Sequence, residues 1–178
     1  NMLFLWIYGD NMEDELGHGG FALFYVAAGI AAGYAHVLSA PGSTVPLVGA
    51  SGAIAGVMGA YLMFYPRARV DVLFIVLILF RVVPIPAWLV LAFWFGSQVV
   101  SGAAMPTGGG GVAYWAHIGG FVAGIVLALP AFLKKGGPAY WRITHGHPPH
   151  PEAQYSRSVI PAAGRRRRSG PYRRGPWS

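Results

Sequence analysis

Gly49-Ala50-Ser51-Gly52-Ala53-Ile54-Ala55-Gly56 and Ala116-His117-Ile118-Gly119-Gly120-Phe121-Val122-Ala123-Gly124 are the two stretches that decide the fold of this chain. Each lies within an apolar segment long enough to cross a bilayer. The first carries one hydroxyl and the second carries one imidazole, and small residues surround both. A hydroxyl and an imidazole in two glycine-lined apolar helices indicate a nucleophile and its base, in a place where water is scarce.

The composition of the whole chain is that of a membrane protein. Of its 178 residues, 54% are hydrophobic and only 11% are charged, whereas soluble domains carry about a quarter charged residues. There are no cysteines, which excludes disulfides, thiolate metal sites and cysteine nucleophiles. The length does not favour a second folded domain beside a membrane bundle.

The basic residues lie in two regions. The net charge is +7, and all 13 Lys and Arg residues fall either between Arg67 and Arg81 or from Lys134 onward. Cytoplasmic loops of membrane proteins carry such an excess, so the 66–71 loop and the tail are expected in the cytoplasm. The positive charge is therefore a topology signal. No nucleic acid is expected as a partner, because anionic lipid headgroups are nearer to the basic residues.

Hydrophobic runs and their breaks predict five membrane-spanning helices. The first is partial, covers residues 1–8 and is expected to end at Gly9 and the acidic residues that follow. Complete spans are expected at about 19–38, 47–65, 86–101 and 113–133. Because residue 1 is an Asn inside an apolar run, without a charged region or a cleavage site, the chain is expected to start in the middle of a protein. The alternation of spans brings Ser51 and His117 near the outer ends of their helices.

Two segments do not fit a plain span. Residues 71–83 are apolar but Pro84 and Pro86 follow at once, so they are expected to form an interfacial or re-entrant segment. From residue 134 the composition changes to Gly, Pro, His and Arg, which cannot bury apolar surface, and this basic tail is expected to be disordered. The sequence thus divides into a transmembrane core at 1–133 and a tail at 134–178.

The tail histidines and the rest of the chain give no indication of a cofactor. His145, His147 and His150 lie in a Pro- and Gly-rich segment, where no scaffold fixes the geometry of metal ligands. We therefore expect neither a metal site nor any other cofactor.

Ser51 and His117 permit nucleophilic catalysis. Serine attacks a carbonyl only when a neighbouring base takes its proton, and histidine is the usual base. Ser51 is expected near the N-terminus of its helix, where free backbone N–H groups and the helix dipole can hold an oxyanion. No acidic residue lies between positions 72 and 151, so the sequence predicts a dyad without an acidic third member.

The glycines predict that the two helices touch. Gly52 and Gly56 form one G-x-x-x-G face and Gly120 and Gly124 form another, and such faces let helices approach closely in lipid. Each signal alone is weak, because serine and G-x-x-x-G are common in membrane helices as packing features. A histidine inside a span is rarer and needs a partner or a cavity. The combination favours a catalytic pair over packing alone.

With these motifs the sequence strongly resembles the rhomboid family of intramembrane serine proteases, and the resemblance runs from residue 1 to about 133. Gly49-x-Ser51-Gly52 matches the nucleophile motif on the fourth core helix of the family, and His117-x-x-Gly120-x-x-x-Gly124 matches the histidine motif on the sixth. The opening Asn-Met-Leu-Phe-Leu-Trp-Ile-Tyr-Gly-Asp-Asn resembles the second core helix of bacterial rhomboids. Asn1 then falls on the asparagine of the family's H-x-x-x-N motif, which helps to form the oxyanion hole.

The resemblance implies an all-α membrane bundle in which core helices 2–6 are present and helix 1 is missing. It implies an integral multi-pass protein of a bacterial inner membrane, acting on membrane-protein segments with destabilised helices near the outer face. Substrate would enter past the second and fifth core helices, where Trp94 and Phe95 would line the gate. The alternative for these two residues is that they are lipid-facing aromatics.

Other functions remain open at the level of sequence. A non-catalytic rhomboid-like module that binds membrane helices is the main alternative, although such relatives usually lack the serine or the histidine. An inactive fragment is another, because the first core helix and the motif histidine do not precede Asn1 in this sequence. A channel or transporter is disfavoured by the lack of paired acidic residues within the spans.

Overall fold

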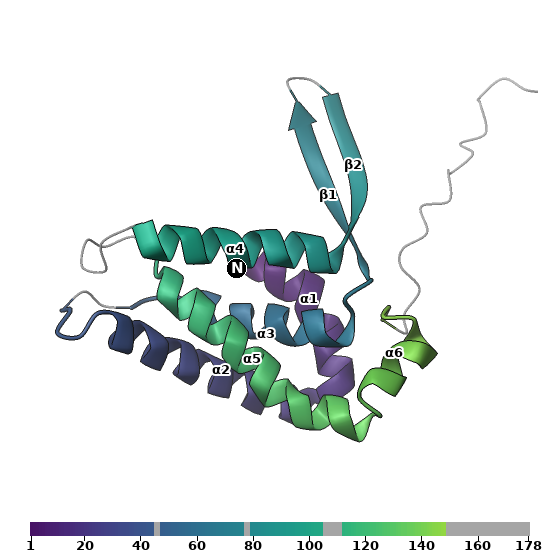
Figure 1. Cartoon of the computed structure of the whole chain (residues 1–178), viewed down its shortest axis with the longest axis horizontal. Helices are drawn as coiled ribbons and strands as arrows, with labels where there is room; N and C mark the ends of the chain where they lie inside the picture. The colour runs from purple at the N-terminus through teal and green to yellow at the C-terminus, as the bar shows by residue number, and fades with distance from the viewer. Residues whose placement is uncertain (45–46, 77–78, 105–111, 149–178) are drawn as a thin grey trace, which may run out of the picture.

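The computed structural model describes residues 1–44, 47–76, 79–104 and 112–148. Within these ranges the chain forms six α-helices and one antiparallel pair of strands (Figure 1). The elements are α1 Met2–Leu16, α2 His18–Ser39, α3 Ser51–Phe64, β1 Arg69–Val76, β2 Leu79–Pro86, α4 Ala87–Ala104, α5 Tyr114–Lys134 and α6 Pro138–Thr144. The expected bundle of apolar helices is confirmed, and the strand pair is an addition to it.

Helix α3 is the centre of the bundle. Every residue from Gly52 to Tyr61 is buried, and α1, α2, α4 and α5 all pack against this helix (Figure 1). Its 14 residues correspond to about 21 Å, which is shorter than the roughly 30 Å hydrocarbon core of a bilayer. The neighbouring α2 and α5, of 22 and 21 residues, are both longer than α3.

The outer surface of the bundle is suited to lipid. Three helices are long and apolar enough to cross a membrane, namely α2, α4 and α5, and α3 is a shorter apolar helix. Large apolar side chains such as Leu23 on α2, Phe93 on α4 and Val126 on α5 are between 61% and 80% exposed. Aqueous solvent would oppose so much apolar surface, whereas hydrocarbon does not.

Helix α1 continues past the point where the sequence predicts its end. It passes through Gly9 and the acidic residues and stops at Gly17, which has a φ of +72°. Tyr8 and Met12 are one turn apart and fully buried, so their packing holds the helix beyond residue 8. The expected end of this helix at Gly9 and the acidic residues was therefore wrong, because tertiary contacts outweigh the local breaking signals.

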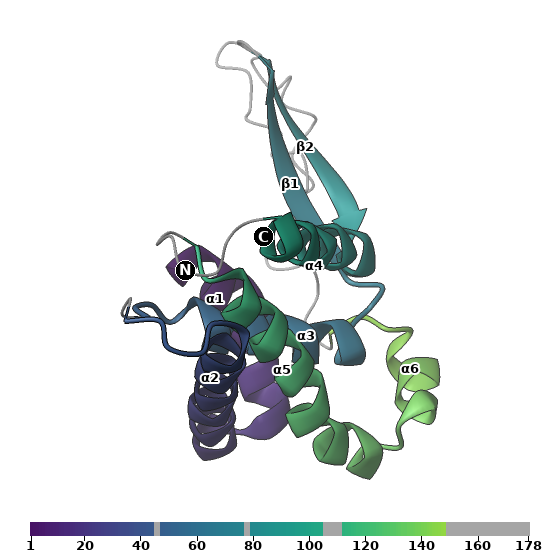
Figure 2. The same cartoon turned by 60° about the vertical axis from the view of Figure 1, so that its left-hand side comes forward.

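The apolar segment after α3 forms a hairpin. Strands β1 and β2 pair in antiparallel register from Arg69 opposite Pro86 to Val76 opposite Leu79, and both views show them projecting away from the helices (Figures 1 and 2). Val and Ile, which are frequent in both strands, favour strand over helix. Pro84 and Pro86 are compatible with the edge of a two-stranded sheet and not with a helix interior. The sequence predicted a re-entrant or interfacial segment here and did not anticipate strands.

Ordered structure also continues beyond residue 133. Helix α6 follows α5 after a short turn and packs back on the bundle, with the Trp141 indole N–H donating to the Met63 carbonyl at 2.9 Å. Disorder starting at residue 134 was therefore wrong for the part described up to residue 148. Two aromatic residues of α6 account for the difference, because they give the segment apolar surface to bury. The Arg-rich part of the predicted tail, residues 149–178, lies outside the described residues.

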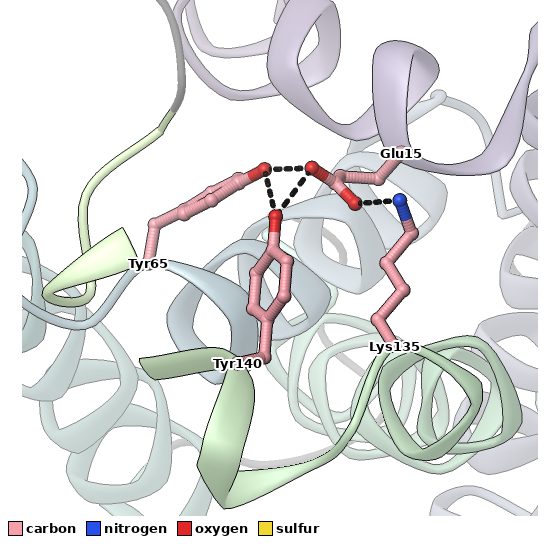
Figure 3. Close-up of polar contacts among 4 residues, drawn as sticks. All are labelled: Glu15, Tyr65, Lys135 and Tyr140. Atoms are coloured by element: carbon pink, nitrogen blue, oxygen red, sulfur yellow. Dashed lines mark hydrogen bonds and ion pairs between the residues drawn. The ribbon is translucent and has the colours of Figure 1, made fainter. Parts of the chain in front are cut away.

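Tyr140 of α6 joins a polar cluster with Glu15, Tyr65 and Lys135, which we call the glutamate cluster (Figure 3). The Lys135 ammonium lies 2.6 Å from Glu15 Oε2, and the Tyr140 hydroxyl donates to Glu15 Oε1 at 2.7 Å. The Tyr65 hydroxyl also donates to Glu15 Oε1. These contacts join the ends of α1, α3 and α5 to α6.

The surroundings fix the protonation states in the glutamate cluster. Burial acts to raise the pKa of Glu15, but hydrogen bonds from Lys135, Tyr65 and Tyr140 outweigh it and hold the pKa below its ordinary value of 4.5. Burial raises the pKa of Tyr140 to about 12 and also raises that of Tyr65. The carboxylate therefore stays charged, and both hydroxyls stay protonated as donors.

Candidate active site

Ser51 and His117 lie in direct contact at one end of the bundle. Ser51 is the first residue of α3 and His117 lies in the first turn of α5. The Ser51 Oγ and His117 Nε2 atoms are 2.8 Å apart, which is hydrogen-bond distance. Both residues are half-buried. The structure thus brings together the hydroxyl and the imidazole that the sequence singles out.

Glycines on α3 and α5 allow this contact. A Cβ on Gly120 would collide with the Gly52 carbonyl, and one on Gly124 would collide with the Gly56 backbone. These four glycines therefore form one seam in which the two backbones touch, as the G-x-x-x-G pattern predicts. Any side chain in the seam would separate the helix that carries Ser51 from the helix that carries His117.

The seam extends further than the two G-x-x-x-G patterns predict. A Cβ on Gly59 would collide with the Phe121 carbonyl, and one on Gly119 would collide with Ala35 of α2. Helix α2 also contributes small residues, since a Cβ on Gly52 would lie 2.6 Å from the Ala32 Cβ atom. The small-residue composition of the 19–38 span is the signal that could have predicted a third helix in this packing.

Gly49 has a different role from the other glycines. It precedes α3 and has a φ of +132°, a conformation that residues with a side chain rarely adopt. Although the sequence suggests that Gly49 serves helix packing with the other motif glycines, the structure gives it a role in the backbone turn that leads into Ser51. Ala50 is the N-cap residue and its carbonyl accepts from the Ile54 N–H at 3.0 Å. The N–H groups at the start of α3 precede the helical hydrogen-bond ladder, so they are available to bind an anion.

Asn1 is not brought to the Ser51–His117 pair. It is the N-cap of α1, it is exposed, and its side chain makes no capping hydrogen bond. In the described part of the chain, the hydrogen bonds of Ser51 and His117 do not involve Asn1. Its predicted place in an oxyanion hole is therefore not supported by a contact here.

Trp94 and Phe95 face α5. The Trp94 ring packs against the imidazole of His117 in a tilted arrangement, with ring centroids 5.8 Å apart, and it also contacts Phe121. Phe95 packs on Phe121 at 4.7 Å. Both residues are half-buried. They form the contact between α4 and α5 beside the histidine, so neither is a purely lipid-facing aromatic.

Gln98 of α4 is the residue at this site that sequence reasoning missed. Its Oε1 atom lies 2.8 Å from His117 Nδ1, so the imidazole has a partner on each ring nitrogen. A glutamine inside an apolar span is costly unless it has a partner, and that unusual position was the available signal. We call Ser51, His117 and Gln98 the serine cluster.

Comparison with known proteins identifies a family for this chain. A family model described as the rhomboid domain matches residues 1–134. The chain is 31% identical over 130 residues to rhomboid protein 1, mitochondrial, of Saccharomyces cerevisiae, which covers 71% of this chain and 35% of the relative. It is 32% identical over 145 residues to the rhomboid protease GluP of Bacillus subtilis, covering 77% of this chain and 24% of the relative.

A mammalian relative is also similar. The chain is 28% identical over 155 residues to the presenilin-associated rhomboid-like protein, mitochondrial, of Mus musculus, covering 83% of this chain and 33% of the relative. The chain thus spans about a third or less of the length of these curated relatives. No solved structure matches it. The family match over most of the chain, together with three apolar helices of spanning length, identifies an integral membrane protein that belongs to the rhomboid family.

Proposed function

We propose that this chain is the core of an intramembrane serine endopeptidase, with Ser51 as nucleophile and His117 as general base and acid. The observation that carries the proposal is the 2.8 Å contact between Ser51 Oγ and His117 Nε2. An imidazole inside a membrane helix is costly, and such residues usually mark a functional site. Here the partner of the imidazole is the hydroxyl that it would activate. The name of one relative, a rhomboid protease, supports the same reaction class.

The geometry supports a two-step acyl transfer. As Ser51 Oγ bonds to the scissile carbonyl carbon, its proton passes to His117 Nε2. The carbonyl oxygen becomes an oxyanion, which the free N–H groups and the positive dipole end of α3 stabilise by several kcal/mol. His117 then gives its proton to the leaving amine. Water, activated by the same imidazole, hydrolyses the acyl-enzyme and restores the Ser51 hydroxyl.

The fold supports a substrate within or beside the bilayer. Because α3 is too short to cross the hydrocarbon core, its first residue is reached most directly by a peptide segment that has unwound from a membrane helix. We therefore propose membrane proteins with helix-destabilised transmembrane segments as substrates, cut near the outer face. We propose that substrate enters past α1 and α4, the second of which carries Trp94 and Phe95. Asn1 remains the proposed additional oxyanion donor, which would require it to approach Ser51 when substrate binds.

The basic residues support the orientation that we propose. Arg67 and Arg69 follow α3, and Lys134 and Lys135 end α5, so positive charge gathers at the ends opposite Ser51 and His117. By the positive-inside bias these ends and the tail face the cytoplasm. In a bacterium this corresponds to the cytoplasmic membrane, with the serine cluster toward the outer side.

The test is cleavage of a model transmembrane substrate by the full-length protein in proteoliposomes. Ser51→Ala and His117→Ala should each abolish cleavage while membrane insertion is retained. Ser39→Ala is the matched control, because Ser39 only donates to the His36 carbonyl at the end of α2. Covalent labelling of wild-type Ser51 by a fluorophosphonate is the second readout. Continued cleavage by Ser51→Ala would refute the mechanism, and binding of membrane helices without cleavage or labelling would favour the non-catalytic module.

A further inference from the structure

Gln98 occupies an exceptional position in the bundle. It is a buried polar residue within an apolar helix, at 9% exposed. A buried amide is tolerated only when its hydrogen bonds are made. Here both ends of the amide have partners, since Oε1 lies 2.8 Å from His117 Nδ1 and Nε2 lies 3.2 Å from Ser97 Oγ.

Ser97 fixes which end of the Gln98 amide faces His117. The Ser97 hydroxyl donates its single hydrogen to the Trp94 carbonyl at 2.6 Å. Its oxygen can therefore only accept toward Gln98, so the NH₂ group of the amide must point at Ser97. The carbonyl oxygen of the amide then points at His117.

This orientation decides the tautomer of His117. A carbonyl oxygen accepts and does not donate, so His117 Nδ1 must carry the hydrogen of the contact with Gln98. In the neutral imidazole the other nitrogen, Nε2, then has a free lone pair. That lone pair faces Ser51 Oγ at 2.8 Å and can accept its proton. With the opposite tautomer, Nε2 would already carry a hydrogen and could not act as a base.

Helix α4 also holds the plane of the imidazole. Trp94 is one helical turn before Gln98, so the two side chains lie on the same face of α4. The Trp94 ring packs against the imidazole, with ring centroids 5.8 Å apart and planes inclined at 35°, while Gln98 binds its edge. Two groups from a single helix thus restrict both the tilt and the rotation of the ring.

We propose that Gln98 is a positioning residue for the Ser51–His117 pair, and that a neutral amide does here what a carboxylate does in soluble serine hydrolases. The inference rests on the proposed function. A neutral amide orients the ring without bringing a charge into the bilayer, where a carboxylate would be costly. Ser97 supports the amide in turn, so the relay runs from the α4 backbone to Ser51 through Gln98 and His117.

The kinetic test compares substitutions at position 98 in the full-length protein in proteoliposomes. Gln98→Leu removes the acceptor and should lower kcat by about 10- to 100-fold while KM changes little, since one hydrogen bond to the reacting pair is lost. Gln98→Glu keeps an oxygen acceptor toward His117 and should restore most of kcat. Val99→Ala, at the exposed neighbouring position, is the matched control and should leave kcat unchanged. Equal kcat values for Gln98→Leu and wild type would overturn the proposal.

The spectroscopic test needs no proteolysis. In a Ser51→Ala protein with ¹⁵N-labelled histidine, NMR should show the His117 Nδ1 atom protonated and the Nε2 atom unprotonated. Adding Gln98→Leu should give a mixture of the two tautomers, because the acceptor that selects one of them is gone. A protonated Nε2 in the first protein, or an unchanged tautomer in the second, would overturn the proposal.

The two tests separate this inference from the proposed function. If wild-type protein neither cleaves nor reacts with a fluorophosphonate, the proposed function fails, and the NMR result alone then decides whether Gln98 sets the tautomer. If cleavage depends on Ser51 but the tautomer does not depend on Gln98, only the positioning role fails.

Discussion

The two polar clusters at opposite ends of α3 are built in opposite ways. The serine cluster consists of neutral groups, and its two hydrogen bonds to His117 are both 2.8 Å long. The glutamate cluster contains an ion pair between Glu15 and Lys135, with a Lys135 side chain that is 39% exposed. The Glu15 side chain is only 5% exposed, and its charge is tolerated because Lys135 and two hydroxyls pair with it, whereas charge is avoided within the spans. Neutral groups are therefore used where chemistry is proposed, and charged groups are used where helix ends are tied together.

The ends of α3 also differ in how the helices are held. Near Ser51 the α3 and α5 backbones touch along the glycine seam, so the position of His117 depends on the absence of side chains. Near Tyr65 long side chains bridge the ends of four helices (Figure 3). Three changes test whether the glycine seam and the glutamate cluster have these different roles, and their expected effects decrease from the first to the third.

The largest effect is expected from Gly124→Ala in the seam. The added Cβ would meet the Gly56 backbone, whose Cα and carbonyl carbon are each 2.5 Å from it, and backbone cannot move aside as a flexible side chain can. The usual gain of about 0.5–1 kcal/mol for alanine over glycine in a helix is outweighed by about 1–3 kcal/mol of overpacking. A displacement of about 1 Å between Ser51 and His117 should lower the cleavage rate about 100-fold. The readouts are cleavage and fluorophosphonate labelling.

Gly96→Ala on α4 is the matched control for the seam, because a Cβ there meets nothing within 4 Å. It should keep wild-type cleavage. Wild-type cleavage by Gly124→Ala would show that the close approach of α3 and α5 is not needed to align the pair.

A smaller effect, on stability, is expected from Glu15→Ala in the glutamate cluster. The change leaves two tyrosine hydroxyls and Lys135 without their shared acceptor and should lower the free energy of unfolding by about 1–3 kcal/mol. Unfolding in mixed detergent micelles measures this. Labelling of Ser51 should be retained in the folded protein, because the clusters are separated by the whole of α3, about 21 Å.

Glu13→Ala provides the control for the ion pair. Glu13 and His18 also lie 2.6 Å apart, but their side chains are 39% and 95% exposed, and such a surface pair contributes less than about 1 kcal/mol. Equal losses of unfolding free energy in Glu15→Ala and Glu13→Ala would show that burial does not strengthen the Glu15–Lys135 ion pair. A loss of Ser51 labelling in folded Glu15→Ala would contradict the independence of the two ends.

The smallest effect on stability is expected from lowering the pH. The pKa of Glu15 is held below its ordinary value of 4.5 in the folded protein, so the contribution of the carboxylate to stability is complete above that pH. It is lost as the pH falls below 4.5 and through the folded pKa. The Tm difference between wild type and Glu15→Gln should therefore be constant at neutral pH and should narrow in acid. A difference that widens as the pH falls would reverse the sign of the linkage.

Local sequence patterns predicted the seam well and the Glu15 end poorly. The G-x-x-x-G faces are a local pattern that allows helices to approach closely in lipid. The sequence alone therefore predicted that the faces of Gly56 and Gly124 lie together. Glu15 and Tyr140 are 125 residues apart, and nothing in either local sequence indicates the other. Gln98 is a similar case. The sequence shows its unusual position in an apolar span, but it does not show that its partner is His117.

Two predictions failed because local signals were given too much weight. Gly9 and the acidic residues after it suggested a helix end, yet buried Tyr8 and Met12 carry α1 onward to Leu16. The Gly- and Pro-rich composition after residue 133 suggested disorder, yet Tyr140 and Trp141 dock α6 on the bundle. In both cases a few tertiary contacts of aromatic or apolar side chains outweigh the local preference of the backbone.

By itself the sequence determined that this protein is a bundle of apolar helices in a membrane and singled out Ser51 and His117 as the proposed reactive pair, because hydrophobic length and glycine spacing act through local rules. Only the tertiary structure decided that Gln98 faces His117, that Trp94 packs against the imidazole and that Glu15 joins four helix ends. Those contacts depend on how helices far apart in the chain rotate and cross, and that is settled by the packing of the whole bundle.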